Sequence, residues 1–149
     1  MQGAVGRIVL GFIAAVVSVL IVHQVIVYAL GMYGLTRSVP WSMRPLGYGW
    51  FPWVPTIVNS AFWGGLWGIL AAFVVPRLPG ALSGVLGWVL FAAIIVTLVN
   101  WFVVLPIKGA PMGGGFRMPG VVVVPIVYGF WGLGMWLIAR GARTALSWR

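Results

Sequence analysis

The side chains that could do chemistry in this chain are few, and they lie inside long apolar runs. The strongly polar ones are His23, Gln24, Asn59 and Asn100. An amide or an imidazole is costly in hydrocarbon unless it finds a hydrogen-bonding partner, because lipid offers none. We therefore expect these four side chains to turn inward and meet one another.

Their positions along the runs place all four in the same half of a membrane. A helix rises about 1.5 Å per residue, so Asn59 lies about 6 Å and Asn100 about 8 Å from the nearest long loop. His23 and Gln24 lie about 10–13 Å from it on the same scale. The other half of the membrane receives no comparable group. The sequence therefore predicts a one-sided polar layer.

Neighbouring residues would extend this layer into a pocket. Tyr128 lies in the last apolar run, and Tyr28 shares a helical face with Gln24. Lys108 and Arg44 stand in the two long loops and would form a cationic rim, which favours an anionic ligand because the chain has no acidic residue. Interhelical hydrogen bonds between such groups also serve packing alone, at about 0.6 kcal/mol each. Two interpretations of these polar residues remain open: they line a ligand pocket, or their hydrogen bonds only hold the helices together.

The residue inventory excludes most catalytic chemistry. The chain has one histidine, no cysteine and no acidic residue. It therefore lacks a carboxylate pair, a charge-relay triad, a reactive thiol and a plausible set of zinc or calcium ligands. We expect neither an enzyme nor a cofactor; an enzyme that uses His23 on a lipid or quinone is the third-ranked alternative.

The elements that must position these groups are membrane helices. Of the 149 residues, 62% are hydrophobic and 6% are charged, whereas soluble domains carry roughly 25% charged residues. Apolar runs of about 18 residues or more predict spanning helices, and four occur, at about 8–31, 55–75, 81–105 and 120–138. We predict an all-α integral membrane protein in which residues 1–149 form a single four-helix transmembrane domain.

Two patterns concern how the helices pack. The second run carries small residues at strict four-residue spacing, a stripe that lets helix backbones approach closely in lipid, within the chain or in a second subunit: Ser60, Gly64, Gly68 and Ala72. The runs also resemble one another in pairs, "LGFIAAVVSVLIVHQ" with "LGWVLFAAIIVTLVNW" and "FWGGLWG" with "FWGLGMW". This suggests two duplicated helical hairpins related by an axis along the membrane normal.

The two long loops, 33–54 and 106–119, are rich in Pro, Gly and aromatic residues. Prolines at positions 40, 45, 52 and 55 forbid a helix through the first loop. Its aromatic side chains belong at the headgroup level of a membrane, where they would anchor the loop or form a lid over the polar layer: Trp41, Tyr48, Trp50, Phe51 and Trp53.

The basic residues indicate the partner and the orientation. They are scattered along the chain, which favours anionic membrane lipids over nucleic acid; a homo-oligomer or a larger membrane complex remains open. One side of the membrane would hold Arg7, Arg77, Arg140, Arg143 and Arg149, and the other Arg37, Arg44, Lys108 and Arg117. Basic loops stay in the cytoplasm, so both termini are predicted there. The excess of basic residues on one side is small, so insertion of the chain in both orientations also stays open.

At "HQ" in the first run, "FWGGLWG" in the second and "WFVVLPIKG" at the end of the third, the chain resembles small uncharacterised bacterial four-helix inner-membrane proteins. The resemblance spans the whole chain through motifs of a packing type. It implies a multi-pass protein of a bacterial inner membrane and no established activity. The small multidrug exporters, another four-helix family, need an embedded Glu that this chain lacks.

Two functions from different classes follow. The first is a non-enzymatic accessory or interaction subunit or a lipid-binding scaffold, supported by the small-residue stripe and the absence of reactive side chains. The alternative is a protein that binds or transports a small anionic or amphipathic solute through the outer-half polar pocket. A non-protein molecule between His23, Asn59 and Asn100 would favour the binding protein, and a filled, dry bundle there would favour the scaffold.

Overall fold

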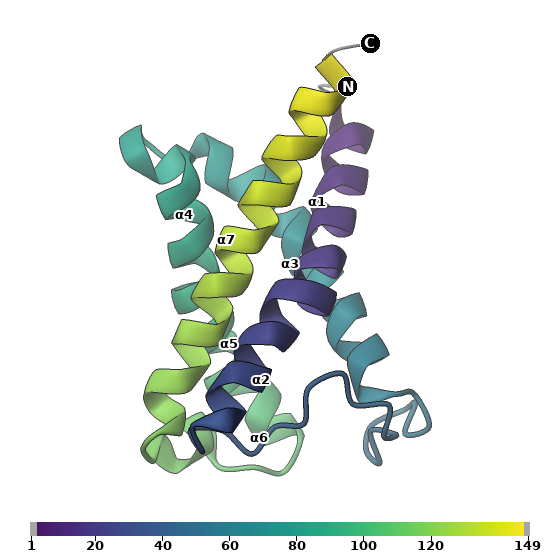
Figure 1. The fold of residues 1–149 in the computed structure, drawn as a ribbon, viewed down its shortest axis with the longest axis vertical. Coiled ribbons are helices and arrows are strands. Elements are labelled where there is room, and N and C mark those ends of the chain that lie inside the picture. The colour runs from purple at the N-terminus through teal and green to yellow at the C-terminus, as the bar shows by residue number, and fades with distance from the viewer. Residues whose placement is uncertain (1–2, 148–149) are drawn as a thin grey trace.

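The computed structural model of the chain, which describes residues 3–147, is an all-α bundle of four membrane-spanning helices (Figure 1). The spans are Ala4–Met32, Thr56–Arg77, Val85–Ile107 and Gly120–Ala145, each long and apolar enough to cross a membrane. Arg149, one of the basic residues used to predict the membrane orientation, lies outside the described residues. The chain is thus a multi-pass membrane protein.

The two ends of the bundle differ. The first span begins and the last span ends at one end, at the top of Figure 1, and the link around residues 78–84 lies there too. We call this the terminal end. Loops 33–54 and 106–119 lie together at the opposite end, which we call the loop end.

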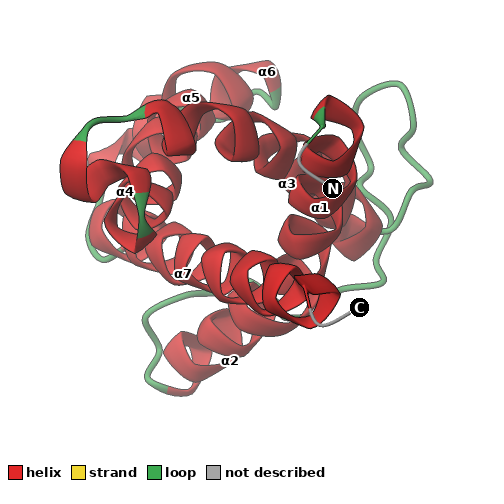
Figure 2. Ribbon diagram, turned by 90° about the horizontal axis from the view of Figure 1, so that it is seen from above, coloured by secondary structure: helices red, strands yellow, loops and turns green. Residues whose placement is uncertain are grey.

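The first span is interrupted where its polar residues occur. It consists of α1 (Ala4–Ser18), a π-helical turn over Val19–His23 and α2 (Gln24–Met32). Such a turn changes the hydrogen-bonding register of the backbone and is frequent at functional sites. Beyond it, α2 lies outside the ring that the other helices form in the end-on view of Figure 2.

The second span, α3 (Thr56–Val74) with a 3-10 turn over Val75–Arg77, packs along α1 through glycine. A methyl group added at Gly11 would lie 2.6 Å from the carbonyl oxygen of Gly68, and one added at Gly68 would overlap the Gly11 carbonyl. Glycine at both positions therefore brings the two backbones into direct contact, as small residues do in lipid.

Of the other members of the predicted stripe, two belong to this helix contact and one lines a cavity. Gly64 lies against the side chain of Val19, and the Ala72 methyl lies beside Gly11. Ser60 instead lines the cavity described below, and its hydroxyl donates a hydrogen bond to the Thr56 carbonyl at 3.0 Å. The close helix contact thus involves Gly64, Gly68 and Ala72 and lies within the chain.

The third span alternates between two kinds of helix. It comprises α4 (Val85–Leu90), α5 (Thr97–Val99) and α6 (Leu105–Ile107), with π-helical segments over Phe91–Val96 and Asn100–Val104. It begins four residues after the expected position 81. The reason is that Gly80–Ser83 form a separate 3-10 turn and that Gly84 has an extended backbone, with φ −104° and ψ −151°, between this turn and α4.

The fourth span belongs to α7 (Gly120–Ser147), which continues beyond the expected end at 138. Hydropathy falls at Arg140 and Arg143, but alanine and arginine are good helix formers, so the helix extends past the apolar part. Between the third and fourth spans, Gly113, Gly114 and Gly115 of the second long loop have positive φ angles of 59°, 63° and 76°, so Met112–Phe116 forms a left-handed turn.

In each of the two helical hairpins, a glycine of one helix packs against the backbone of the other helix. Gly132 of α7 approaches the carbonyl of Trp88 in α4, where an added methyl would lie 2.5 Å from that oxygen, much as Gly68 approaches Gly11. This recurrence agrees with a duplication, which itself stays a prediction. Spans one and four join the hairpins, because the Ser18 hydroxyl donates to the Trp131 carbonyl at 2.8 Å.

The hydrophobic core draws side chains from all four spans. Trp131 and Met135 of α7 are almost fully buried, and Trp88 of α4 is 3% exposed. The rings of Trp67 in α3 and Phe91 in the third span meet edge to face at 6.1 Å. These large side chains pack between the spans in the middle of the bundle, so the polar side chains at the loop end are separated from the terminal end.

Candidate functional site

The polar side chains of the first span are set by a short hydrogen-bonded chain. The main-chain N–H of Trp41 donates to Gln24 Oε1 at 2.8 Å. Because a main-chain N–H can only donate, this contact identifies the amide oxygen, and the Gln24 amide nitrogen then donates to His23 Nδ1 at 3.1 Å. A neutral His23 with Nδ1 as acceptor carries its proton on Nε2. Within residues 3–147, that nitrogen makes no hydrogen bond with the protein.

A cavity of about 340 Å³ opens beside these two residues at the loop end. Five of the seven predicted ligand residues line it: His23, Gln24, Asn100, Lys108 and Tyr128. They come from the first, third and fourth spans and from the second long loop. The ring centroids of His23 and Tyr128 are 6.1 Å apart.

The second span and the first long loop complete the cavity wall. These elements supply hydroxyl groups from Thr36, Ser38, Ser42, Thr56 and Ser60. The apolar part of the lining is formed by Val27, Val39, Ile57, Val123, Val124 and Val127. The lining can therefore both donate hydrogen bonds and contact an aliphatic group.

Two of the predicted ligand residues do not line the cavity. Thr56 and Ser60, one helical turn apart, face it, so the adjacent Asn59 is rotated about 100° away. The Arg44 side chain is exposed. Its contribution comes from the main chain, because its carbonyl accepts hydrogen bonds from the N–H and the hydroxyl of Thr56, both at 2.9 Å, and so caps the start of α3.

The expected helical neighbour of Gln24 also points elsewhere. Gln24 is buried, whereas Tyr28 is 54% exposed and does not line the cavity. The side of α2 that packs inward is marked by Val27, which clusters with Val123 and Val127 of α7. Because α2 departs from the bundle after the π-helical turn, four-residue spacing from Gln24 does not keep Tyr28 inside.

Lys108 is the cation of the cavity rim. Its ammonium lies 5.2 Å from the centre of the Tyr48 ring, a cation–π contact between the two long loops. The lysine therefore links the loops while its donors stay accessible at the mouth of the cavity. No acidic side chain exists in the sequence to neutralise it.

Trp41 holds the first long loop over the cavity. Besides the hydrogen bond to Gln24, its indole Nε1 donates to the Leu20 carbonyl at 2.8 Å, within the π-helical turn. Its φ is 49°, unusual for a residue other than glycine. By contrast, Trp50 and Trp53 at the tip of the same loop are 94% and 71% exposed. The loop thus has an inner part that covers the cavity and an outer aromatic tip.

Sequence reasoning placed Trp41 only among the aromatic residues that anchor the loop or form a lid, and it missed the contacts of Trp41 and most of the hydroxyl groups. The hydroxyls of Thr36, Ser38 and Ser42 carry a detectable signal, since they follow closely on the first span in a loop placed above the polar layer. The position of Trp41 depends on one backbone conformation and carries no such signal. Its aromatic character alone predicts only a place at the interface.

The fold and the site together define a multi-pass α-helical membrane protein with a polar cavity at its loop end. Comparison of the chain with protein-family models, with curated proteins and with solved structures finds no match. The resemblance to small bacterial inner-membrane proteins stays a prediction.

Proposed function

We propose that this protein binds a small amphipathic anion, such as an acyl carboxylate or a lipid phosphate, in the loop-end cavity, without catalysing a reaction. The observation that supports the proposal most is that side chains from all four spans and Lys108 line one cavity. A cavity of about 340 Å³ is within the range of small-molecule sites.

The donors in the cavity suit an anion. The Lys108 ammonium, the Nε2–H of a neutral His23 and the Asn100 amide all can donate, and the chain has no carboxylate side chain to repel a negative charge. The valine-rich wall would take the aliphatic part. A lining with both donors and valines favours a ligand that has one charged end and an aliphatic part.

Binding is better supported than the accessory or scaffold function. The small-residue stripe, the main support for a partner subunit, is occupied by α1 within the chain. Buried side chains such as Trp131 and Met135 separate the cavity from the terminal end, which favours binding over transport. We further propose a bacterial inner membrane as the location, with both termini in the cytoplasm, on the basis of the resemblance and the basic residues.

The proposal is tested by titrating the purified protein in detergent with decanoate and measuring binding by calorimetry. Lys108→Ala should weaken binding roughly five-fold, because an exposed charge contributes a modest amount, while Lys108→Arg should largely keep it. Raising the salt concentration should weaken binding of the unmodified protein.

The matched control is Arg117→Ala, which removes an exposed cation of the second long loop that does not line the cavity. It should leave decanoate binding unchanged. A cationic amphipath of the same chain length, decyltrimethylammonium, should not compete. Equal effects of Lys108→Ala and Arg117→Ala, or equal binding of the two amphipaths, would refute the proposal.

A further inference from the structure

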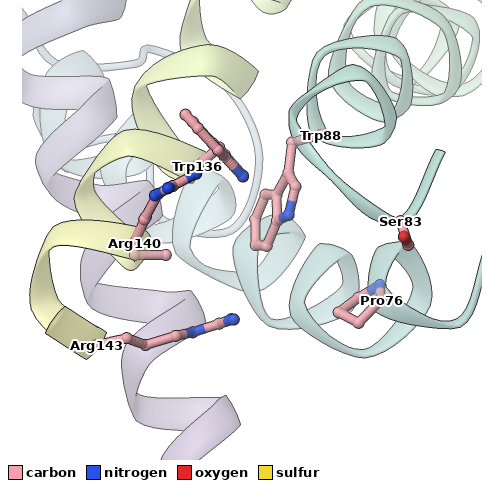
Figure 3. Close-up of a pocket in the computed structure, with 7 residues that line it drawn as sticks. Pro76, Ser83, Trp88, Trp136, Arg140 and Arg143 are labelled. Carbon is pink, nitrogen blue, oxygen red and sulfur yellow. The ribbon is translucent and has the colours of Figure 1, made fainter. Parts of the chain in front are cut away.

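A second cavity lies at the terminal end, on the opposite side of the membrane from the first. Its volume is about 300 Å³ (Figure 3). It lies between the last turns of α7, the start of α4 and the link that follows the second span. Its lining consists of Pro76, Ser83, Trp88, Trp136, Ala139, Arg140 and Arg143.

Two arginines on one helical face dominate the charge of this cavity. Arg140 and Arg143 are three residues apart on α7, so their side chains are neighbours, and Figure 3 shows Arg143 extending from α7 towards the Trp88 side. Like charges at this spacing repel each other. The sequence contains no acidic side chain that could relieve the repulsion, so a bound anion is the favourable way to do so.

The aromatic lining orients one of these charges. The guanidinium carbon of Arg140 lies 5.1 Å from the centre of the Trp136 ring. A guanidinium that stacks on an indole face keeps its N–H edges available for a planar, forked contact with an oxyanion. The small Ala139, buried at 3% exposure, leaves room beside it.

Another arginine of the terminal end, Arg77, is engaged differently. Arg77 donates a hydrogen bond to the Phe73 carbonyl and lies 5.7 Å from the centre of the Phe73 ring. It does not line the cavity. Arg77 therefore has the same charge and lies at the same end of the bundle, without taking part in the cavity.

We propose that the terminal-end cavity binds a phosphate group through Arg140 and Arg143. A phosphate offers several oxygens to two forked guanidinium groups, and arginine is the residue that best matches this geometry. Indole rings settle at the headgroup level of a membrane, so the half-buried Trp136 beside Arg140 places the site where lipid phosphates lie. A lipid headgroup and a water-soluble phosphate ester share this chemistry.

The test uses the full chain in detergent and two phosphate probes, dihexanoyl phosphatidic acid and glycerol 3-phosphate, with dihexanoyl phosphatidylcholine as the zwitterionic comparison. Binding is measured by native mass spectrometry and calorimetry. Arg140→Gln and Arg143→Gln should each weaken phosphatidic acid binding roughly ten-fold, the order expected for one charge-assisted hydrogen bond. Both side chains are exposed, so these variants should fold.

One control and one change of background separate this site from other charges. Arg77→Gln should leave binding of phosphatidic acid unchanged, because Arg77 does not line the cavity. In the Lys108→Ala background, which weakens binding at the loop-end cavity, the losses caused by Arg140→Gln and Arg143→Gln should persist. If glycerol 3-phosphate binds as tightly as phosphatidic acid and depends on the same arginines, the ligand is a soluble phosphate ester; if only phosphatidic acid binds, it is a lipid headgroup. Absence of binding by both probes, or an equal loss in Arg77→Gln, would overturn the proposal.

Discussion

At the scale of single residues, the loop-end cavity depends on how Trp41 joins a loop to a membrane helix. Its main chain donates to Gln24 and its indole donates to the Leu20 carbonyl, both at 2.8 Å. The first contact fixes the Gln24 amide and, through it, the His23 ring. One loop residue thus positions two side chains of the cavity that lie deeper in the membrane.

Trp41→Phe should loosen this attachment, because it keeps an aromatic ring and removes only the indole N–H. A hydrogen bond of this kind contributes about 1 kcal/mol, so amide hydrogen exchange of residues 36–46 should become roughly five-fold faster. Trp50→Phe is the matched control in the same loop, because Trp50 is 94% exposed. If both variants exchange at the rate of the unmodified protein, the indole does not hold the loop.

The polar residues show what desolvation can and cannot predict. His23, Gln24, Asn100 and Tyr128 were expected to meet because lipid offers them no partner, and the structure brings them to one cavity. The same desolvation argument applies to Asn59, which nevertheless does not line the cavity. Desolvation favours a hydrogen-bonding partner for a buried polar side chain, but the rotation of the helix about its axis decides which way that side chain faces.

At the scale of helices, the contact between α1 and α3 is the closest backbone approach in the first hairpin. Gly68 meets backbone, the Gly11 carbonyl, whereas Gly64 meets a side chain, that of Val19. Backbone cannot move aside as a side chain can. The two glycines of one stripe should therefore differ in their tolerance of a methyl group.

Gly68→Ala should lower the free energy of unfolding by about 1–3 kcal/mol, the usual cost of overpacking, and Gly64→Ala by less. Gly31→Ala is the control, since a methyl group there has no heavy atom within 4 Å. Thermal unfolding of the three variants in the same detergent measures the order of their stabilities. Equal stability of Gly68→Ala and Gly31→Ala would contradict the close contact.

Helix positions were largely predictable, and their internal irregularities were not. Hydropathy predicts four spans because bilayer thickness sets a minimum apolar length. It does not report the hydrogen-bonding register of the backbone, so the π-helical turns at Val19–His23 and Asn100–Val104 left no sequence signal. Those turns contain His23 and Asn100, which line the cavity. The π-helical turns that sequence does not predict are therefore the ones that shape the site.

At the scale of the whole molecule, cationic groups lie at both ends and apolar surface lies between them. Each end also carries a cavity with basic residues in its lining, Lys108 at the loop end and Arg140 with Arg143 at the terminal end. A chain with net charge +9 and no acidic residue has no internal counterions. Both ends therefore favour anionic headgroups and solutes.

The same distribution makes membrane orientation a sensitive property. Among the described residues the terminal end holds Arg7, Arg77, Arg140 and Arg143, and the loop end holds Arg37, Arg44, Lys108 and Arg117. These numbers are equal, so the described residues give no net bias, and the proposed cytoplasmic position of the termini rests on the sequence position of Arg149.

Both long loops should lie on one side of the membrane and the link at Ser83 on the other, because four spans return the chain to its starting side. The chain has no cysteine, so Met43→Cys, Met112→Cys and Ser83→Cys each introduce a single exposed thiol. In intact cells, a membrane-impermeant maleimide should label the first two and spare the third. Lysed cells should show all three labelled. Labelling of Met43→Cys and Met112→Cys from opposite sides would contradict the arrangement of the spans, whereas half-labelling of all three in intact cells would contradict a single orientation.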